Sequence, residues 1–420
     1  MRRLVGTAIL LGRSRSRQTE TAKLRQVMLV GLLVAMVTLV SCTQPGAVAQ
    51  VTPPHFSDVS GIYGVDKVIT IINTTKEAVI YYTTDGTIPS KNSLKYTNPV
   101  LVSGDGTIMT VSAFAAVAGL IDSEVVSATF TIMYTWLSLP PSSILPGIGN
   151  GQFSGPGRIV VDSNDRIYIS DCLNDRIVRM DDIRAKNWIT YGSTGAGIGQ
   201  FSNPIGIAID STNRIYIADQ VNKRIVRIDD LSGANWTLLS GSGSGDNLSA
   251  PHSIAIDSNG KIYITDGFRI VRSDDMNGTN WISFGSQGSG INQFYSPNGI
   301  AVDIGGHIYI ADFTGNRIVR IDDMSGSNWI TLTSSGSGLD QLSRPGDIAI
   351  DVIGRIYITD VYNYRIVRVD DIGGTNWTVF GSIGLGYAQF SNPSGIACDS
   401  TGHVYVSDYD LNRIDRIFLN

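Results

Sequence analysis

The sequence has few cysteines for its length. Cys42, Cys172 and Cys398 are the three cysteines in 420 residues, whereas proteins that depend on disulfides usually have more. We therefore expect hydrophobic cores to hold the fold, and we expect Cys172 and Cys398 to be free thiols. The chain has 46 Gly and 14 Pro with ordinary apolar content, so disorder is not expected, and its length allows two or three domains.

Positive charge is scarce beyond the N-terminus. The chain has 32 Lys and Arg against 37 Asp and Glu. Residues 1–41 hold seven of the basic residues and one acid, which leaves 25 basic and 36 acidic residues in the remainder, a balance of −11. An acidic surface repels phosphate backbones, whereas nucleic-acid binders usually have a basic face. Nucleic acid is therefore excluded as the expected partner.

The N-terminus has the pattern of an export signal. Basic residues up to Arg25 precede an uncharged apolar run that ends in LVSC at residues 39–42. This run is shorter than the ~20 apolar residues that a membrane-spanning helix needs. The tetrapeptide resembles a lipobox, the processing site of bacterial lipoproteins. The resemblance implies a signal peptide over residues 1–42 and a lipid on Cys42, so that the exported protein is anchored to a bacterial membrane and faces the periplasm or the cell surface.

A linker at residues 43–53 leads to a segment with the alternating pattern of β-strands. Residues 54–134 contain runs such as KVITII and AVIYYTT between turn dipeptides, which predict a small β-sandwich. The stretch AVIYYTTDGTIPSKNSLKY at 78–96, with the opening PPHFS and the closing VVSATFTI, resembles the chitobiase/β-hexosaminidase C-terminal domain. That family is an accessory module without catalytic residues, so the resemblance implies a spacer or, more weakly, a polysaccharide setting.

Six repeated units follow from residue 151. Their prolines are 46 to 48 residues apart, which indicates a repeat architecture. Each unit has four short apolar runs, as in GIAID, RIYIAD, RIVRIDD and NWTLLSG within residues 206–241, and four short strands make one propeller blade. The units resemble the NHL repeat through SNPIGIAIDSTNRIYIADQVNKRIVRID at 202–229 and its siblings. We therefore expect an all-β chain, a six-bladed NHL-type β-propeller preceded by the small β-sandwich. The prolines are Pro156, Pro204, Pro251, Pro297, Pro345 and Pro393.

The tryptophans predict how the ring closes. In the first five units a tryptophan opens the fourth strand, but the last unit ends without one. The remaining tryptophan, Trp136, precedes the first unit. We therefore expect residues 135–150 to supply the outer strand of the last blade, so that the propeller spans 135–420 and no blade is left open.

Aspartates recur in the units, and we interpret them as structural. One Asp closes the second strand of each unit, and an Asn–Arg motif follows it in nearly all of them; a residue present in every blade is usually needed by the blade. Asp-Asp pairs after the third strand are expected to form Asx turns, with a calcium site as the weaker alternative. The first set is Asp171, Asp219, Asp266, Asp312, Asp360 and Asp408, and the pairs begin at Asp181, Asp229, Asp274, Asp322 and Asp370.

Residues for catalysis are scarce in the repeats. Six-bladed propellers include hydrolases and lyases whose sites combine Glu, His, Asn or Asp with a metal. The repeats contain no Glu and three histidines, His252, His307 and His403. His307 and His403 take a turn position that Arg or Lys fills in other units, so we expect them to be solvent-exposed, and a single histidine does not make a zinc site. We predict no enzyme and no cofactor; the alternative is a metal-dependent lyase that resembles the streptogramin lyases, or a lactonase-like hydrolase.

The units differ most in the loops of one propeller face, which join the second strand to the third and the fourth to the next blade. Aromatic residues gather in these loops, and a rigid ring of such loops suits recognition of protein or carbohydrate. We predict a non-catalytic, lipid-anchored binding or scaffold protein. Packing between blades is the competing role of each aromatic, and a spacer without a ligand is the third interpretation. The candidate ligand-binding residues are His252, Phe268, Tyr295, Phe313, Tyr362, Tyr364, Tyr387 and Tyr409.

Overall fold

The computed structural model describes residues 48–64, 66–103, 107–132, 136–140, 145–243, 245–333 and 335–418. The expected signal and Cys42 lie outside the described residues. The chain divides into two compact units, both built from strands. Two short 3₁₀ turns, η1 (Cys172–Asn174) and η2 (Val361–Asn363), are the helical elements of the described part. No helix there is long and apolar enough to cross a membrane.

The strands between residues 55 and 132 form the small sandwich. Its larger sheet has the order β2-β9-β8-β5-β6, and β1–β4 and β3–β7 are separate pairs. In β9, Ala128, Phe130 and Ile132 are buried and the residues between them are half-buried, because successive side chains of a strand point to opposite faces. The strands are β1 (His55–Phe56), β2 (Gly61–Tyr63), β3 (Lys67–Ile69), β4 (Ile71–Ile72), β5 (Val79–Thr83), β6 (Leu94–Lys95), β7 (Val100–Val102), β8 (Ile108–Ala116) and β9 (Val126–Ile132).

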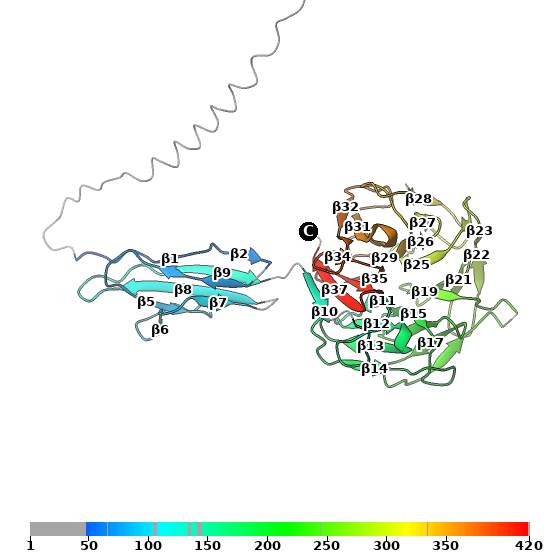
Figure 1. The fold of residues 1–420 in the computed structure, drawn as a ribbon, viewed down its shortest axis with the longest axis horizontal. Coiled ribbons are helices and arrows are strands. Elements are labelled where there is room, and N and C mark those ends of the chain that lie inside the picture. The colour runs from blue at the N-terminus through cyan, green and yellow to red at the C-terminus, as the bar shows by residue number, and fades with distance from the viewer. Residues whose placement is uncertain are drawn as a thin grey trace, which may run out of the picture. The chain divides into compact units, whose positions relative to one another are not determined.

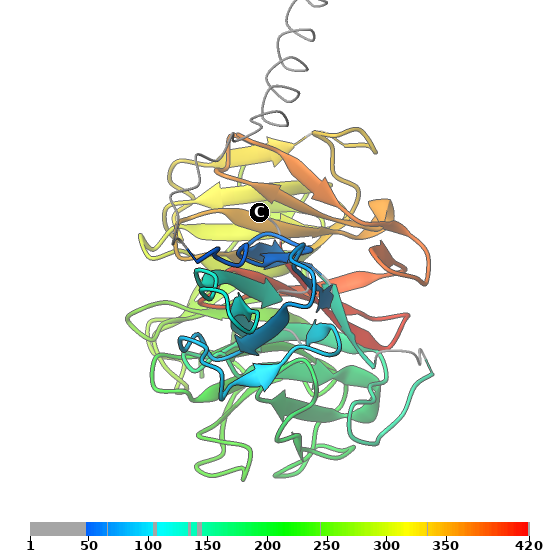
Figure 2. The ribbon, with the colours of Figure 1, turned by 90° about the vertical axis from the view of Figure 1, so that its left-hand side faces the viewer.

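Six antiparallel four-stranded sheets form the blades of the propeller (Figure 1, Figure 2). Each blade begins with an inner strand at one of the repeated prolines. Blades 1 to 3 are β11 (Pro156–Val161), β12 (Ile167–Asp171), β13 (Arg176–Met180), β14 (Ile189–Tyr191); β15 (Pro204–Ile209), β16 (Ile215–Asp219), β17 (Arg224–Ile228), β18 (Thr237–Leu239); and β19 (Pro251–Ile256), β20 (Ile262–Asp266), β21 (Arg269–Ser273), β22 (Ile282–Phe284).

Blades 4 to 6 continue the same order, with short parallel strand pairs in two of the connections. They are β25 (Pro297–Val302), β26 (Ile308–Asp312), β27 (Arg317–Ile321), β28 (Ile330–Thr333); β29 (Pro345–Ile350), β30 (Ile356–Asp360), β31 (Arg365–Val369), β32 (Thr378–Phe380); and β35 (Pro393–Cys398), β36 (His403–Asp408), β37 (Arg413–Phe418) with β10 (Trp136–Leu139). The connecting pairs are β23 (Ser286–Gln287) with β24 (Gln293–Phe294) and β33 (Ser382–Ile383) with β34 (Gln389–Phe390).

The last blade takes its outer strand from the segment before the first repeat. β10 pairs antiparallel with β37, with Trp136 opposite Ile417 and Leu139 opposite Ile414, and Figure 1 shows the cyan β10 beside the red β37. The Trp136 ring lies 5.4 Å from the Phe390 ring. Three other blades have the same aromatic pair at 5.2 to 5.5 Å, so Trp136 takes the place of the tryptophan that the last repeat lacks. These pairs are Phe153–Trp188, Phe201–Trp236 and Phe294–Trp329.

Hydrophobic cores lie between neighbouring blades. In β16, Ile215 and Ile217 pack into the cluster shared with blade 1, whereas Tyr216 and Ala218 pack into the cluster shared with blade 3. Both faces of the strand are therefore buried, which explains why every residue of β16 is buried. Burying one isoleucine side chain contributes about 1.5–3 kcal/mol, so the ring is stabilised at each junction between blades.

The repeated aspartates have the structural role that the sequence indicates. Asp219 Oδ2 accepts hydrogen bonds from Arg224 Nε at 2.7 Å and Asn222 Nδ2 at 2.8 Å, and Oδ1 accepts one from the Ser202 amide at 2.7 Å. Blades 1, 4 and 5 repeat the Asp–Arg ion pair. Blade 6 departs from it, because the Nε atom of Arg413 instead lies 2.9 Å from Asp415 Oδ2.

The Asp-Asp pairs form Asx turns. In blade 2, Asp229 accepts a hydrogen bond from the Asn235 side chain at 2.6 Å, and Asp230 accepts one from the backbone amide of Ser232 at 2.8 Å. Asp181, Asp274, Asp322 and Asp370 likewise accept hydrogen bonds from asparagine side chains six residues on. Hydrogen bonds within the turn thus account for the pairs, as the first interpretation predicted.

The expected solvent exposure of two histidines is wrong. His403 has a side chain that is 14% exposed, and its Nδ1 lies 3.0 Å from Asp399 Oδ2. His307 is 35% exposed, with Nδ1 2.8 Å from Asp303 Oδ2. Other blades place Arg or Lys at this turn, so the histidines replace a paired cation rather than a free surface residue. Cys172 and Cys398 are free thiols, as expected.

Candidate ligand-binding site

A cavity of about 220 Å³ opens where the first residues of the inner strands meet the loops that follow the second strands. We call it the loop-face cavity. The residue after each repeated proline lines it; these residues are Gly157, Ile205, His252, Asn298, Gly346 and Ser394. Arg158, Cys172, Phe313, Val361, Asn392 and Tyr409 complete the lining. The repeat thus delivers six equivalent backbone positions to one place, and the differences between repeats give them different side chains.

The structure brings three of the eight candidate residues to this cavity. His252 comes from β19, Phe313 from the loop after β26, and Tyr409 from the loop after β36. Each is half-buried. A neutral imidazole and two aromatic rings therefore line one concave surface, an arrangement typical of small-molecule sites.

The other five candidates do not line the loop-face cavity. Tyr362 is 52% exposed and packs edge-on against Phe313, with ring centroids 6.1 Å apart. Tyr387 packs against Trp136 of the outer strand β10, with ring centroids 5.5 Å apart. This contact fits packing between strands, the alternative to ligand binding, for Tyr387. The remaining three are Phe268 and Tyr295, which are exposed, and Tyr364, which is half-buried and ends the η2 turn.

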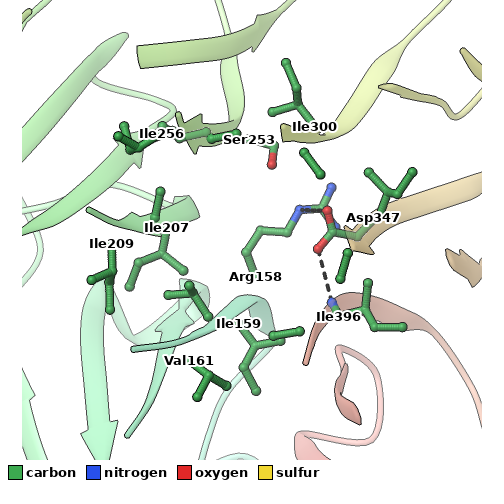
Figure 3. Close-up of a pocket in the computed structure, with 18 of the residues that line it drawn as sticks. Arg158, Ile159, Val161, Ile207, Ile209, Ser253, Ile256, Ile300, Asp347 and Ile396 are labelled. Carbon is green, nitrogen blue, oxygen red and sulfur yellow. Dashed lines mark hydrogen bonds and ion pairs between the residues drawn. The ribbon is translucent and has the colours of Figure 1, made fainter. Parts of the chain in front are cut away.

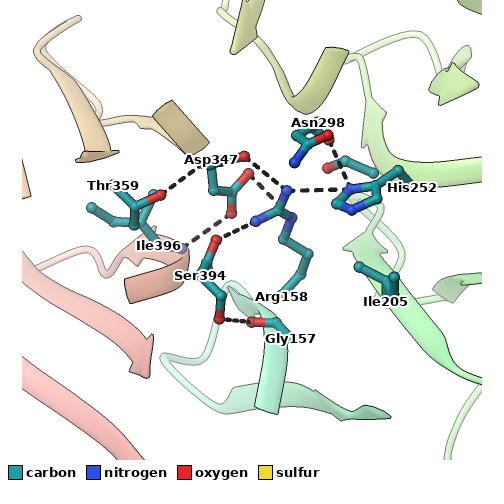
Figure 4. Close-up of polar contacts among 12 residues, drawn as sticks. Gly157, Arg158, Ile205, His252, Asn298, Asp347, Thr359, Ser394 and Ile396 are labelled. Carbon is teal, nitrogen blue, oxygen red and sulfur yellow. Dashed lines mark hydrogen bonds and ion pairs between the residues drawn. The ribbon is translucent and has the colours of Figure 1, made fainter. Parts of the chain in front are cut away.

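Arg158 was not among the candidates, although it forms the floor of the cavity. It is the third residue of β11, and its guanidinium reaches across to the other side of the ring (Figure 4). Nη2 donates to Gly346 O at 2.8 Å and lies 3.4 Å from His252 Nδ1, while Nη1 donates to Ser394 O. One side chain from blade 1 therefore contacts blades 3, 5 and 6.

Asp347 compensates the charge of Arg158. Its Oδ1 lies 3.5 Å from Arg158 Nε, and both side chains are less than 8% exposed. Its Oδ2 accepts a hydrogen bond from the Ile396 amide at 3.1 Å. Burial raises the pKa of Asp347, whereas Arg158 and the backbone hydrogen bond oppose that shift. Because a buried ion is costly unless it is paired, we take the pair as ionised and mutually dependent.

Glycines in neighbouring blades make room for this pair. A Cβ atom on Gly299 would lie 2.7 Å from the Asp347 Cα, and one on Gly395 would lie 2.8 Å from the Arg158 Cα. The third residue of the inner strands therefore alternates around the ring between glycine and a larger residue. In chain order it is Arg158, Gly206, Ser253, Gly299, Asp347 and Gly395. This alternation is visible in the sequence and is the signal that could have identified Arg158 and Asp347.

His252 is held neutral by its surroundings. Desolvation, followed by the positive charge of Arg158, lowers the pKa of the imidazole to about 3, and the hydrogen bond to Asn298 O at 3.2 Å opposes the shift. The ring is therefore uncharged at neutral pH. A neutral imidazole offers one donor and one acceptor nitrogen, so it serves hydrogen bonding rather than charge pairing.

A second cavity of about 230 Å³ lies on the other side of Arg158 (Figure 3). Arg158 lines both cavities. Below it the lining is mainly aliphatic, as in Val161, Ile209, Ile256 and Val302. The buried ion pair therefore separates a polar and aromatic cavity from an aliphatic one.

Within the described residues, no three His, Cys, Asp or Glu side chains gather as a metal site. Arg158 contacts both the acid Asp347 and the imidazole of His252. The positive charge of Arg158 disfavours a cation at this place.

Family comparisons agree with both parts of the chain. Residues 59–127 match the chitobiase/beta-hexosaminidase C-terminal domain, and residues 201–228 and 294–321 match the NHL repeat. The ring is a six-bladed β-propeller, and two of its six repeats match the NHL model. A comparison with the curated proteins finds no match.

Solved structures that are similar to this chain have different functions. An auxiliary nutrient binding protein from Bacteroides ovatus is 17% identical with a TM-score of 0.56, covering 90% of this chain and 99% of its own. A gluconolactonase from Xanthomonas campestris is 15% identical with a TM-score of 0.50, covering 64% and 87%. Virginiamycin B lyase from Staphylococcus aureus is 14% identical with a TM-score of 0.46, covering 82% and 100%. At such identities the likeness is one of fold alone.

Proposed function

We propose that this protein is a non-catalytic binding protein whose loop-face cavity takes a small, neutral carbohydrate. A lipid on Cys42 would hold it on a bacterial membrane, facing the periplasm or the cell surface. The observation that carries the proposal is the convergence of His252, Asn298, Phe313 and Tyr409 on one cavity. Aromatic rings pack against the C–H faces of a sugar, and uncharged polar groups bind its hydroxyls.

The size and charge of the cavity favour this ligand class. A volume of about 220 Å³ lies below the roughly 300–1,000 Å³ of sites for drug-sized ligands, so a single ring is the expected size. Arg158 is compensated by Asp347, and His252 is neutral, so no net charge attracts an ion. A polymer would be bound through one terminal residue, with the loops around Phe313 and Tyr409 as its further contacts.

Two alternatives are less well supported. A spacer without a ligand needs no polar cluster, yet Arg158, His252, Asn298 and Asp347 meet in the channel. The second alternative is that this protein is a metal-dependent lyase or a lactonase-like hydrolase, and only similarity of fold favours it. Its chemistry requires ligands that converge on a metal, and Arg158 occupies the centre of the polar cluster.

Thermal unfolding of the full chain against a ligand panel tests the proposal. The panel holds neutral methyl glycosides, the matching uronic acids, amino sugars, proteins from an envelope extract and divalent metals. A ligand that binds the native state raises the unfolding midpoint. We expect a rise with a neutral glycoside that His252→Ala abolishes. A rise with metal alone, together with turnover of a lactone or ester, would reject the proposal in favour of an enzyme.

A further inference from the structure

The Nδ1 atom of His252 lies between two groups with opposite requirements. Asn298 O is 3.2 Å away, and Arg158 Nη2 is 3.4 Å away. A carbonyl oxygen can only accept a hydrogen bond, and a guanidinium nitrogen can only donate one. A neutral ring therefore bonds to one of these two neighbours, and the choice decides which nitrogen carries the proton.

The surrounding hydrogen bonds favour a proton on Nδ1. Arg158 Nη2 already donates to Gly346 O at 2.8 Å, so it keeps a partner when Nδ1 does not accept. The contact between Nδ1 and Asn298 O is the shorter of the two, and without a proton on Nδ1 two lone pairs would face each other there. With Nδ1–H donating to Asn298 O, the Nε2 lone pair has no partner in the described part of the chain.

The charges around the ring exclude its doubly protonated form. Arg158 is the cation in contact with it, and Asp347 faces Arg158 from β29. No acid lines the loop-face cavity. Burial raises the pKa of Cys172 to about 12 and also raises the pKa of Tyr409, so both stay neutral. A proton on Nε2 would place a second positive charge beside Arg158 without an anion to compensate it.

Asn298 lines the loop-face cavity together with His252. Its backbone belongs to β25, the inner strand that follows β19 around the ring. Its side-chain amide lies 3.2 Å from Ser296 Oγ and carries both a donor and an acceptor group. A hydroxyl group both donates and accepts. A ligand hydroxyl in the cavity can therefore donate a hydrogen bond to His252 Nε2.

We infer that the loop-face cavity selects its ligand through one hydroxyl group, which donates a hydrogen bond to His252 Nε2. Arg158 is the positioning residue that holds the imidazole in this state. The inference rests on the proposed function and narrows it to neutral polyhydroxy compounds. A carboxylate or a methyl ether has no hydrogen to donate at this point and is rejected.

Nitrogen NMR of the full chain labelled with ¹⁵N-histidine tests the role of Arg158 without any ligand. We expect the His252 ring to carry its proton on Nδ1 and to stay neutral from pH 5 to 8. In Arg158→Met/Asp347→Asn both charges are removed at similar size, and the protonation midpoint of His252 should rise, because the positive charge of Arg158 is one cause of its lowered pKa. Ser253→Gly is the matched control, because it changes the equivalent position of β19 and keeps the ion pair. A wild-type ring protonated on Nε2, or an unchanged midpoint in the double variant, overturns the inference; if that variant does not fold, the wild-type spectrum decides.

Calorimetry with methyl β-D-glucoside, methyl β-D-galactoside and their monodeoxy analogues tests the selected hydroxyl. One deoxy analogue should bind about tenfold more weakly, since a lost hydrogen bond to a buried partner has about that effect. His252→Phe should lose the same factor, whereas His252→Gln keeps an acceptor and should bind within about threefold of wild type. If neither glycoside binds wild type, the proposed function fails while the NMR result still stands. If a glycoside binds but every analogue and His252→Phe bind equally well, the inference fails and the proposed function remains.

Discussion

Ser138 donates a hydrogen bond to the carboxylate of Asp415, and this contact joins segments 277 residues apart at the closure of the ring. Ser138 lies in β10, before the first repeat, and Asp415 lies in β37, the last strand. Trp136 Nε1 donates to Ser138 Oγ at 2.8 Å, so the closing strand is bonded through side chains as well as backbone. The other five blades have a buried valine where blade 6 has Asp415; these are Val178, Val226, Val271, Val319 and Val367.

Asp415 should make stability depend on pH. Burial, opposed by Arg413 and Ser138, raises the pKa of Asp415 to about 7. Between roughly pH 4 and 7, Asp415 keeps its proton in the folded state but has lost it in the unfolded state. The contribution of Asp415 to the free energy of unfolding therefore falls as pH rises through that window. Asp415→Asn removes the titration and keeps the shape. The free energy of unfolding of wild type minus that of Asp415→Asn should decrease by at most about 4 kcal/mol from pH 4 to 8, measured by urea denaturation. A difference that does not vary with pH would contradict this assignment.

Trp136 should stabilise the whole propeller. Its indole is 8% exposed, stacks on Phe380 and packs at a tilt against Phe390. Trp136→Ala should lower the free energy of unfolding by about 3–5 kcal/mol, as for other buried aromatic residues, and removal of 135–150 should lower it further. Hydrogen exchange is the decisive measurement. Because β10 closes the ring, protection should fall in blades 1 and 5 as well as in blade 6; a loss confined to β10 and β37 would show that closure is not cooperative.

The sequence predicted the parts of the fold that repeat, and the unrepeated parts had to come from the structure. The period of the prolines was enough to expect six blades. Because the sixth repeat lacks a tryptophan and Trp136 precedes the first repeat, the pairing of β10 with the last blade could also be expected. Arg158 and Asp347 were not predicted as site residues, because each is an exception at a position where three blades have glycine. Their contact depends on the ring bringing blades 1 and 5 together, and spacing along the chain does not reveal it. Loop aromatics were predictable as a group, but their packing partners were not, as Tyr387 on Trp136 illustrates.

The repeated aspartates should affect stability and not binding. Asp219 is fully buried and satisfies Ser202, Asn222 and Arg224. Asp219→Ala would leave Arg224 buried without its anion, so the free energy of unfolding should fall by about 3–5 kcal/mol. Below the unfolding temperature, the affinity for the glycoside found in the panel should stay within about twofold, a change of less than ~0.5 kcal/mol. Calorimetry that shows a large loss of affinity for the folded variant would instead place this motif in the site.

The loop aromatics should divide into two groups by their effect on binding. Tyr409 and Phe313 line the loop-face cavity, whereas Tyr362 is largely exposed and is hydrogen bonded through its hydroxyl to Arg344 Nη1 at 2.6 Å. Tyr409→Ala should therefore weaken binding of a neutral glycoside by about tenfold or more, because a ring in contact with the ligand is worth ~1 kcal/mol or more. Tyr362→Ala combined with Tyr364→Ala serves as the matched surface control and should change the affinity less than about threefold. If the double variant abolishes binding while Tyr409→Ala does not, the ligand contacts the outer loops, and the binding surface is a broad face that suits a protein or a long polysaccharide.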